Sequence, residues 1–322
     1  MKTKKISIIG AGNIGGTIAH LLATKQVGNI VLFDRKKKIA KGKSLDILHS
    51  CSDYGIDANI IGSDNYRDIE DSDVIIVTAG ISRKPGMSRD DLLENNSTVM
   101  KKVGEGIKQF SKNAFVICIT NPLDVMVYLL QKYSEIKDHK IVGMAGVLDS
   151  ARFSTLIAKE FNVPIKNVEA YVMGGHGDTM VPITSISKVC GTTIDKLLFR
   201  KEISLERLNT LIELTRNGGV EIVNLLQYSA YYAPSSSALL MAESYLYDKS
   251  MTLTCAVKVK KGTYNLEEDL FVGVPTKIDS KGAFPLEMEL NEEERILFKK
   301  SSETVKNLKN HVDSLTVQFH SE

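Results

Sequence analysis

The chain has 322 residues, enough for one large domain or two of medium size. Hydrophobic residues make up 43% of it and charged residues 25%, as in ordinary globular proteins, and a net charge of +2 is too small to argue for a nucleic-acid partner. The four cysteines lie far apart and form no C-x-x-C pair, which argues against a bound metal and against a disulfide framework. Reduced thiols are typical of the cytoplasm, where we expect the protein to reside.

No apolar run approaches the roughly 20 residues that a membrane-spanning helix requires, so no membrane association is expected. The N-terminal stretch MKTKKISIIGAG places lysines before apolar residues, as a signal peptide does, but glycines interrupt its apolar part. We therefore expect no signal peptide. The basic run at residues 35–38 is interpreted as the solvated start of a helix rather than as a phosphate-binding patch.

The first half of the chain alternates short, very apolar runs with amphipathic stretches. The apolar runs predict strands buried on both faces, at residues 5–10, 29–34, 58–63, 73–80, 114–120 and 140–145. Helical patterns separate them, for example at residues 14–24 and 91–110. Buried strands that alternate with helices predict an α/β fold over residues 1–145, a doubly wound parallel sheet of the Rossmann type.

The pattern changes after about residue 145. We expect a helix at residues 149–161, a long helical region across 204–249, antiparallel strands around 252–259 and a last helix from Asn291. Asn291 and Glu294 have the spacing of a capping box at the start of that helix. These elements predict a second, α+β domain over residues 146–322.

The sequence GAGNIG places three glycines between the first predicted strand and the first predicted helix. The motif alone is weak evidence, but a strand before it and a helix after it are the context of a dinucleotide site. Glycines let the main chain approach a pyrophosphate, and the free N–H groups at the helix N-terminus favour its charge. The predicted cofactor contacts in this segment are Gly10, Ala11, Gly12, Asn13, Ile14 and Gly15.

Asp34 stands at the end of the second predicted strand. Its carboxylate can accept hydrogen bonds from the hydroxyl groups of the adenine ribose, and its charge would repel the 2′-phosphate of NADP. NAD is therefore the expected cofactor. Arg35 could neutralise a 2′-phosphate, which leaves NADP as the alternative.

Four further segments lie where a doubly wound sheet places its chemistry, beyond the ends of strands or in the adjoining domain. They are the loop GISRKPGMSRDDL with Arg83 and Arg89, ITNPLD with Asn121, LDSAR with Asp149 and Arg152, and GGHGD with His176. Taken singly, each has an ordinary explanation as a surface connection, a turn residue, an ion pair or a loop histidine.

Together, these residues meet the needs of hydride chemistry on a hydroxy acid. His176 titrates near neutral pH and can carry a proton, and Asp149 can orient it. Arg152 shares a helical face with Asp149 and offers a cation to a carboxylate. Asn121 adds a hydrogen-bond donor. The combination downstream of a dinucleotide motif predicts a dehydrogenase.

Over nearly its full length the chain resembles the lactate/malate dehydrogenases, and among them the lactate-dehydrogenase-like malate dehydrogenase branch. The resemblance rests on GAGNIGG, VTAGISRKPGMSRDDLL, TNPLD, GMAGVLDSARF, GGHGD and SAYYAPSSSA. It implies an NAD-dependent enzyme of the tricarboxylic acid cycle that reversibly oxidises (S)-malate to oxaloacetate. It also implies a homodimer or a homotetramer, and a tetramer is the expectation for this branch.

The resemblance further implies roles for individual residues. His176 exchanges a proton with the substrate oxygen, and Asp149 orients the imidazole and favours its charged form. Arg152 holds the C1 carboxylate of the substrate. Arg89 polarises the substrate carbonyl and stabilises the negative charge that develops there.

A second set of implied roles concerns substrate choice and cofactor contacts. Arg83 matches the position that selects the substrate, where an arginine suits the second carboxylate of oxaloacetate and a glutamine suits the methyl group of pyruvate. Asn121 hydrogen-bonds the reacting region. The implied cofactor contacts near it are Asn96, Ile119, Thr120 and Asn121 itself.

Other 2-hydroxy acids with an acidic side chain would fit the same charge pattern as malate, and two alternative functions also remain open. A lactate dehydrogenase would use the same constellation with a smaller substrate, and Arg83 argues against it. A non-catalytic dinucleotide-binding protein descended from such an enzyme is expected to have lost His176, Asp149 or Arg152, and the sequence retains all three.

Overall fold

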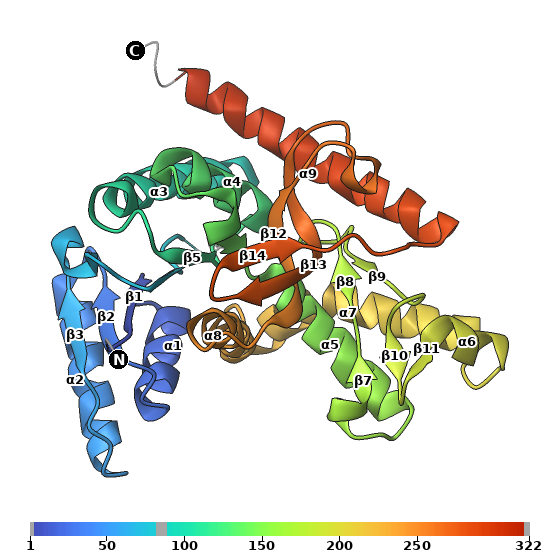
Figure 1. Ribbon diagram of the computed structural model, residues 1–322, viewed down its shortest axis with the longest axis horizontal. Coiled ribbons are helices and arrows are strands. Elements are labelled where there is room, and N and C mark those ends of the chain that lie inside the picture. Colours follow the sequence, from blue (N-terminus) through green and yellow to red (C-terminus); the bar gives the residue numbers. More distant parts are fainter. Residues whose placement is uncertain (1–2, 82–88, 319–322) are drawn as a thin grey trace.

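The computed structural model describes residues 3–81 and 89–318 (Figure 1). Within these residues the largest sheet has nine strands in the order β14-β13-β12-β6-β5-β4-β1-β2-β3. The strands are β1 (Lys5–Ile9), β2 (Asn29–Phe33), β3 (Ile60–Ser63), β4 (Val74–Val77), β5 (Phe115–Cys118), β6 (Ile141–Gly143), β12 (Met251–Val259), β13 (Leu270–Asp279) and β14 (Gly282–Pro285).

The first six strands are parallel and have the order β3-β2-β1-β4-β5-β6. This doubly wound order confirms the predicted fold, and each of the six predicted apolar runs contains one strand. β4 and β5 are buried along their whole length. The reason is that one hydrophobic cluster, which includes Ile76 and Ile117, fills one face of the sheet and a second, which includes Ile75 and Val116, fills the other.

Helices account for most of the remaining chain. They are α1 (Asn13–Thr24), α2 (Lys37–Ser52), α3 (Arg89–Phe110), α4 (Leu123–Ser134), α5 (Ala145–Glu160), α6 (Ile194–Phe199), α7 (Leu205–Leu226), α8 (Tyr232–Leu246) and α9 (Glu292–Gln318). Short strands lie between α5 and α6, namely β7 (Val168–Glu169), β8 (Val172–Met173), β9 (Val181–Pro182), β10 (Lys188–Val189) and β11 (Thr192–Thr193). The helices of residues 3–81 and 89–318 are all too short or too polar to cross a lipid bilayer.

Two predicted helices have different bounds in the structure. α5 begins at Ala145 rather than at residue 149, because Gly146 lies inside the helix instead of ending the preceding element. A Cβ atom on Gly146 would lie 2.7 Å from the carbonyl oxygen of Thr254, so this glycine allows α5 to pack closely on β12. The predicted helical region 204–249 is two helices, and the left-handed residue Gln227, with φ of 63°, ends the first of them.

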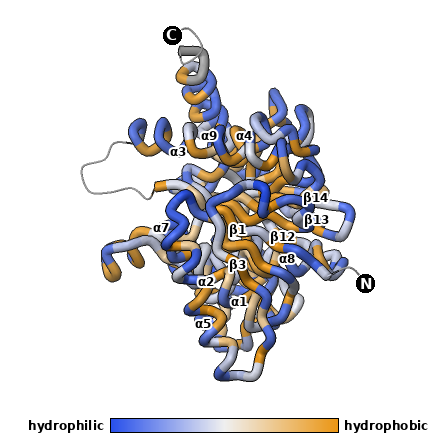
Figure 2. The backbone as a smooth tube through the Cα atoms, turned by 90° about the vertical axis from the view of Figure 1, so that its left-hand side faces the viewer, coloured by the Kyte–Doolittle hydropathy of each residue, from blue (hydrophilic) through white to orange (hydrophobic). Residues whose placement is uncertain are grey.

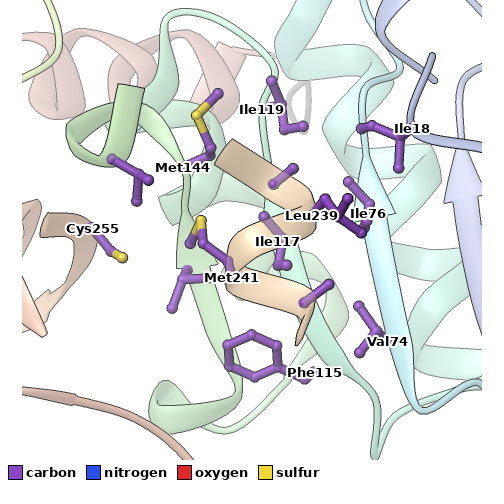
Figure 3. Close-up of a cluster of buried hydrophobic side chains, with 14 of the residues drawn as sticks. Ile18, Val74, Ile76, Phe115, Ile117, Ile119, Met144, Leu239, Met241 and Cys255 are labelled. Atoms are coloured by element: carbon purple, nitrogen blue, oxygen red, sulfur yellow. The ribbon is translucent and has the colours of Figure 1, made fainter. Parts of the chain in front are cut away.

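The second half of the chain extends the sheet of the first half. β12 pairs with β6 in antiparallel orientation through Ala256 and Gly143. α8 then lies against the face of the parallel strands, as Figure 3 shows for Leu239 beside Ile76 and Ile117. The ring of Tyr245, also in α8, stacks on Phe115 with the ring centroids 4.4 Å apart. The two halves therefore share one continuous core.

The hydropathy of the chain follows this arrangement. Figure 2 shows hydrophobic residues along β1, in the middle of the molecule, and hydrophilic residues over much of the surface. β3 is the edge strand of the sheet, and its Ile61 is exposed. The basic run at residues 35–38 is exposed at the start of α2, as predicted. The capping box at the start of α9 is also confirmed, since the Asn291 side chain accepts the Glu294 N–H at 2.9 Å and the Glu294 side chain accepts the Asn291 N–H at 3.0 Å.

Candidate active site

The glycine-rich loop lies where the strand order reverses, between the carboxyl ends of β1 and β4. Gly10 has a φ of +112°, and a Cβ atom there would lie 2.6 Å from Oγ1 of Thr78, so only glycine fits. The Thr78 hydroxyl donates to the Gly10 carbonyl at 2.9 Å and ties the two strand ends together. A Cβ atom on Gly12 would meet nothing within 4 Å, so the main chain faces open space there.

The N-terminus of α1 begins in this loop. Gly12 precedes the helix without a side-chain cap, and the first turn contains no acidic residue. The first N–H groups of the helix therefore have no competing side-chain acceptor, which suits the negative charge of a pyrophosphate. The open cradle at Gly12 and this helix end both fit a dinucleotide.

Asp34 lies immediately after β2, beside the same loop. One carboxylate oxygen accepts the Ala11 N–H at 2.9 Å, and the other accepts the Lys36 N–H at 2.8 Å. Lys43 of α2 reaches the loop from the other side and donates to the Gly12 carbonyl at 2.7 Å. Burial lowers the pKa of Lys43, and the charge of Asp34 opposes that shift. The predicted contact of Asp34 with the adenine ribose stays a prediction.

Other predicted cofactor contacts fall in two groups. Ile14, Ile119, Thr120 and Asn121 line one cavity of about 360 Å³ at the carboxyl edge of the sheet. Asn96 behaves differently, because it is completely buried and its amide is engaged with the main chain. It accepts the Ile81 N–H at 2.8 Å and donates to the Asn121 carbonyl at 2.7 Å. Its contact with the cofactor stays a prediction, whereas its observed bonds hold Ile81 next to Asn121.

The cavity is lined by both halves of the chain. From the second half it receives residues of α5, the loop after β8, α7, the segment before α8 and the first turn of α8, which are Leu148, Arg152, His176, Gly177, Asp178, Met180, Arg216, Gly219, Val220, Val223, Ser229, Ala230 and Pro234. The glycine-rich loop reaches it through Ile14. The fold thus brings the predicted proton carrier to the same cavity as the predicted cofactor contacts.

His176, Asp149 and Arg152 form a connected cluster in this cavity. Nδ1 of His176 lies 2.8 Å from Oδ2 of Asp149, and Nη1 of Arg152 donates to Oδ1 of Asp149 at 3.2 Å. The Asp149 side chain is only 2% exposed, whereas that of His176 is 20% exposed. Because Asp149 holds Nδ1, the other ring nitrogen, Nε2, remains for a ligand.

The electrostatics of the cluster favour the charged form of the histidine. Burial lowers the pKa of His176, but the Asp149 carboxylate raises it through both charge and hydrogen bonding, and Asp124 raises it further. The positive charge of Arg152 has the opposite effect and lowers the pKa of His176. The net effect places the pKa of His176 above its ordinary value.

Arg152 is held from the side by two glycines of α7. Cβ atoms on Gly218 and Gly219 would lie 3.4 Å from Cδ and from Nη2 of Arg152, respectively. Larger residues at these positions would compete with the guanidinium for space. The glycines therefore keep room for the arginine and for a ligand bound to it.

Two residues at the site were not among the predicted functional residues. Asp124 lies in the first turn of α4 and accepts the main-chain N–H of His176 at 2.9 Å. Its place in the motif TNPLD was the only signal in the sequence. Arg216 of α7 lines the cavity and donates from Nε to the Met180 carbonyl at 3.1 Å. No local pattern marks Arg216, because the tertiary fold brings α7 to the histidine loop.

The structure does not describe the side chains of two predicted residues. Arg83 falls within residues 82–88, outside the described part of the chain. Arg89 is the first residue of α3, and the structure describes only its main chain. Their roles stay predictions from the sequence.

A glycine-rich loop that shares a cavity with a carboxylate-bound histidine and a guanidinium is the arrangement expected of a nicotinamide-dependent dehydrogenase. Residues 4–143 match the family described as lactate/malate dehydrogenase, NAD binding domain, and residues 146–316 match its alpha/beta C-terminal domain. The chain belongs to the lactate/malate dehydrogenase family, and its first half is the NAD-binding domain.

Individual relatives agree with this assignment. The chain is 57% identical over 309 residues to a malate dehydrogenase of Francisella philomiragia, which covers 96% of this chain and 97% of the relative. The crystal structure of Cryptosporidium parvum malate dehydrogenase has a TM-score of 0.92, with 44% identity over 97% of this chain and 99% of that one. A lactate dehydrogenase from the same organism, in complex with lactic acid and NAD, has a TM-score of 0.93, with 40% identity and the same coverage.

Proposed function

We propose that the chain is an NAD-dependent malate dehydrogenase that interconverts (S)-malate and oxaloacetate. The observation that carries the reaction type is the cluster of His176, Asp149 and Arg152 in the cavity beside the dinucleotide loop. The 57% identity to a malate dehydrogenase supports the substrate. Arg83 in the sequence supports it independently, as a cation for a second carboxylate.

The acid–base role belongs to His176. In malate oxidation the neutral imidazole accepts the hydroxyl proton of C2, and in the reverse direction the imidazolium returns it. Asp149 holds Nδ1, so that the exchange takes place at Nε2, and its charge stabilises the imidazolium. When bound, the nicotinamide of NAD accepts the hydride from C2 of malate or returns it to oxaloacetate.

Four further residues bind and orient the substrate in this proposal. Arg152 pairs with the C1 carboxylate, and its bond to Asp149 and the two α7 glycines fix the position of its guanidinium. Asn121, at the lining of the cavity, donates to the reacting region. Arg89 stabilises the charge on the carbonyl oxygen, and Arg83 pairs with the distal carboxylate.

The proposed division of the chain assigns residues 1–145 to the cofactor and 146–322 to the substrate. The family matches end at residue 143 and resume at 146, which supports this boundary. Because β12 continues the sheet of the first half, we expect the two domains to unfold as one unit rather than separately.

We also propose that the enzyme is a homotetramer in the cytoplasm. Large hydrophobic side chains are exposed on α2 and α7, including Leu45, Leu205, Leu225 and Leu226, and a second copy would bury such surface. All four cysteines are free thiols, which suits a reducing compartment. Light scattering coupled to size-exclusion chromatography distinguishes a tetramer from a dimer.

NADH oxidation measured side by side with oxaloacetate and with pyruvate tests the proposed activity. We expect kcat/KM for oxaloacetate to exceed that for pyruvate by at least about a hundredfold, because only oxaloacetate can use a second cation. A preference for pyruvate would identify a lactate dehydrogenase. NADH binding without turnover of either acid would identify a non-catalytic dinucleotide-binding protein.

A further inference from the structure

The buried carboxylate of Asp124 contacts the main chain of the catalytic histidine. Asp124 is the second residue of α4, and its side chain is only 7% exposed. Oδ2 accepts the main-chain N–H of His176 at 2.9 Å, across 52 residues of sequence. A Cβ atom on the preceding residue, Gly175, would lie 3.5 Å from the same oxygen, so the carboxylate packs directly against the histidine loop.

The other carboxylate oxygen of Asp124 is also buried, and among the described residues it has no hydrogen-bond partner. A buried polar atom without a partner is unfavourable, so its retention calls for an explanation. Burial raises the pKa of Asp124 to about 6, against the His176 N–H bond and the His176 charge, which lower it. The carboxylate is therefore largely ionised at neutral pH.

The histidine loop makes a second main-chain contact of this kind, which can be compared with that of Asp124. Ser301 of α9 accepts the N–H of Gly175 at 2.9 Å, so two helices hold two successive amides of this loop. Ser301 does so with a neutral hydroxyl. Asp124 does so with a carboxylate, and a neutral acceptor would have sufficed for the bond alone.

We propose that Asp124 is a positioning residue for proton transfer, which fixes the main chain of His176 and whose negative charge stabilises the imidazolium together with Asp149. Arg152 of α5 also acts on His176 and lowers its pKa, and Arg216 of α7 and Asp178 of the same loop line the cavity with it. The carboxylates of Asp149 and Asp124 thus raise the pKa of His176, whereas the guanidinium group of Arg152 lowers it. The proposal rests on the acid–base role of His176 in the proposed function.

The substitution Asp124→Asn separates charge from position, because the amide oxygen can still accept the His176 N–H. The measurement is the NMR titration of the His176 ring in the full-length protein without substrate, assigned by comparison with His176→Asn. We expect the pKa of His176 to fall by about 1 in Asp124→Asn. The matched control, Ser301→Ala, removes a neutral acceptor from the neighbouring amide and should leave that pKa unchanged.

The pH dependence of turnover provides a second readout. Oxaloacetate reduction requires the imidazolium, so its decline at high pH should begin at a lower pH in Asp124→Asn, by the same amount as in the titration. An unchanged pKa of His176 in folded Asp124→Asn overturns the proposal, as does an equal fall in Ser301→Ala. Absence of turnover in the unmodified protein would contradict the proposed function but would leave the titration result intact.

A measurement on the unmodified protein covers the case in which Asp124→Asn does not fold. The side-chain carboxyl carbon of Asp124 should titrate near pH 6, and His176→Asn should raise that pKa because the neighbouring positive charge is lost. A carboxyl group that stays protonated up to pH 8, or that ignores the loss of His176, overturns the proposal.

Discussion

Nδ1 of His176 lies 2.8 Å from Oδ2 of Asp149, although 27 residues of sequence separate them. One residue comes from a loop after β8 and the other from the first half of α5, which begins directly after β6. Both residues belong to the second half of the chain, and the bond from the His176 N–H to Asp124 of α4 ties the pair to the first half. The packing of the two halves thus brings the histidine pair to the cavity that Ile14 of the glycine-rich loop also lines.

The first prediction concerns the protonation of His176. Because the pKa of His176 is raised, malate oxidation, which needs the neutral form, should decline as pH falls, with a midpoint above about 6.5. Oxaloacetate reduction, which needs the charged form, should decline as pH rises through the same pKa. His176→Asn should slow the chemical step by roughly a hundredfold or more, measured as single-turnover NADH oxidation.

NADH fluorescence titration is the control for this variant, since cofactor binding should be unchanged. Near-normal turnover of His176→Asn with oxaloacetate would remove the histidine from its role. The pH profiles in the two directions should have opposite slopes, and each midpoint reports the pKa of His176 in the enzyme form present in that direction.

The second prediction concerns cofactor choice. Asp34→Ser removes an anion and weakens a hydrogen bond to the loop at Ala11, so KM for NAD should rise roughly tenfold to a hundredfold. NADP should improve relative to NAD, because Arg35 and Lys43 remain nearby as cations for a 2′-phosphate. Steady-state kinetics with both cofactors measure the ratio.

The double variant Asp34→Ser, Lys43→Met identifies the cation responsible. Lys43 donates a hydrogen bond to the Gly12 carbonyl, and loss of its charge should reverse much of the gain in NADP use. If the unmodified protein already prefers NADP, the interpretation of Asp34 is wrong.

The parallel half of the fold could be predicted from the sequence because its signals are local. Each buried strand there is a short apolar run. In the second half, the capping box of α9 was predictable for the same reason, because it is formed by Asn291 and Glu294, three residues apart. The start of α5 could not be predicted, because the reason for Gly146 is contact with Thr254 on a strand more than a hundred residues away. The extension of the sheet by β12 is likewise a tertiary event.

In the candidate site, too, residues marked by local motifs could be predicted and residues placed by tertiary contacts could not. Its motif residues, such as Asp149, Arg152 and His176, could be predicted because their residue types suit the chemistry and they occur in short recognisable segments. Arg216 could not, because its place at the cavity depends on the tertiary contact with the Met180 carbonyl and nothing in its own helix marks it. Asn96 was expected at the cofactor, and only the structure reveals that its side chain bonds to Ile81 and Asn121.

The third prediction concerns the space around Arg152. In Gly219→Ala the new methyl group would lie 3.4 Å from Nη2 of Arg152, an ordinary contact, and alanine should stabilise α7 by up to about 1 kcal/mol. In Gly219→Val the additional methyl groups would displace the guanidinium. We expect KM for oxaloacetate to rise at least about tenfold in the valine variant, because the carboxylate clamp is misplaced.

Asn217→Val is the matched control, since it places the same β-branched residue at an exposed position of the same helix. It should lower helix stability slightly and leave KM unchanged. Equal effects of the two valine substitutions on KM would show that Gly219 acts through the helix and not through Arg152.

The last prediction concerns substrate choice. Arg83→Gln should remove the cation that pairs with the distal carboxylate of oxaloacetate, and truncation of a desolvated charge pair costs on the order of 2–5 kcal/mol. Since about 1.4 kcal/mol corresponds to a factor of ten in kcat/KM, oxaloacetate should lose roughly thirtyfold to several-thousandfold. Pyruvate has no second carboxylate, so its activity should rise. The measurement is kcat/KM for both acids with NADH.

Arg89→Gln is the comparison that distinguishes specificity from chemistry. Arg89 is predicted to serve the carbonyl group that both acids share, so this variant should lose turnover with oxaloacetate and pyruvate alike, by roughly a hundredfold or more. Arg83→Gln should instead change the ratio between the two acids by orders of magnitude. If Arg83→Gln slowed both acids equally, Arg83 would be a general catalytic or structural residue, and the preference for malate would have to come from elsewhere in the cavity.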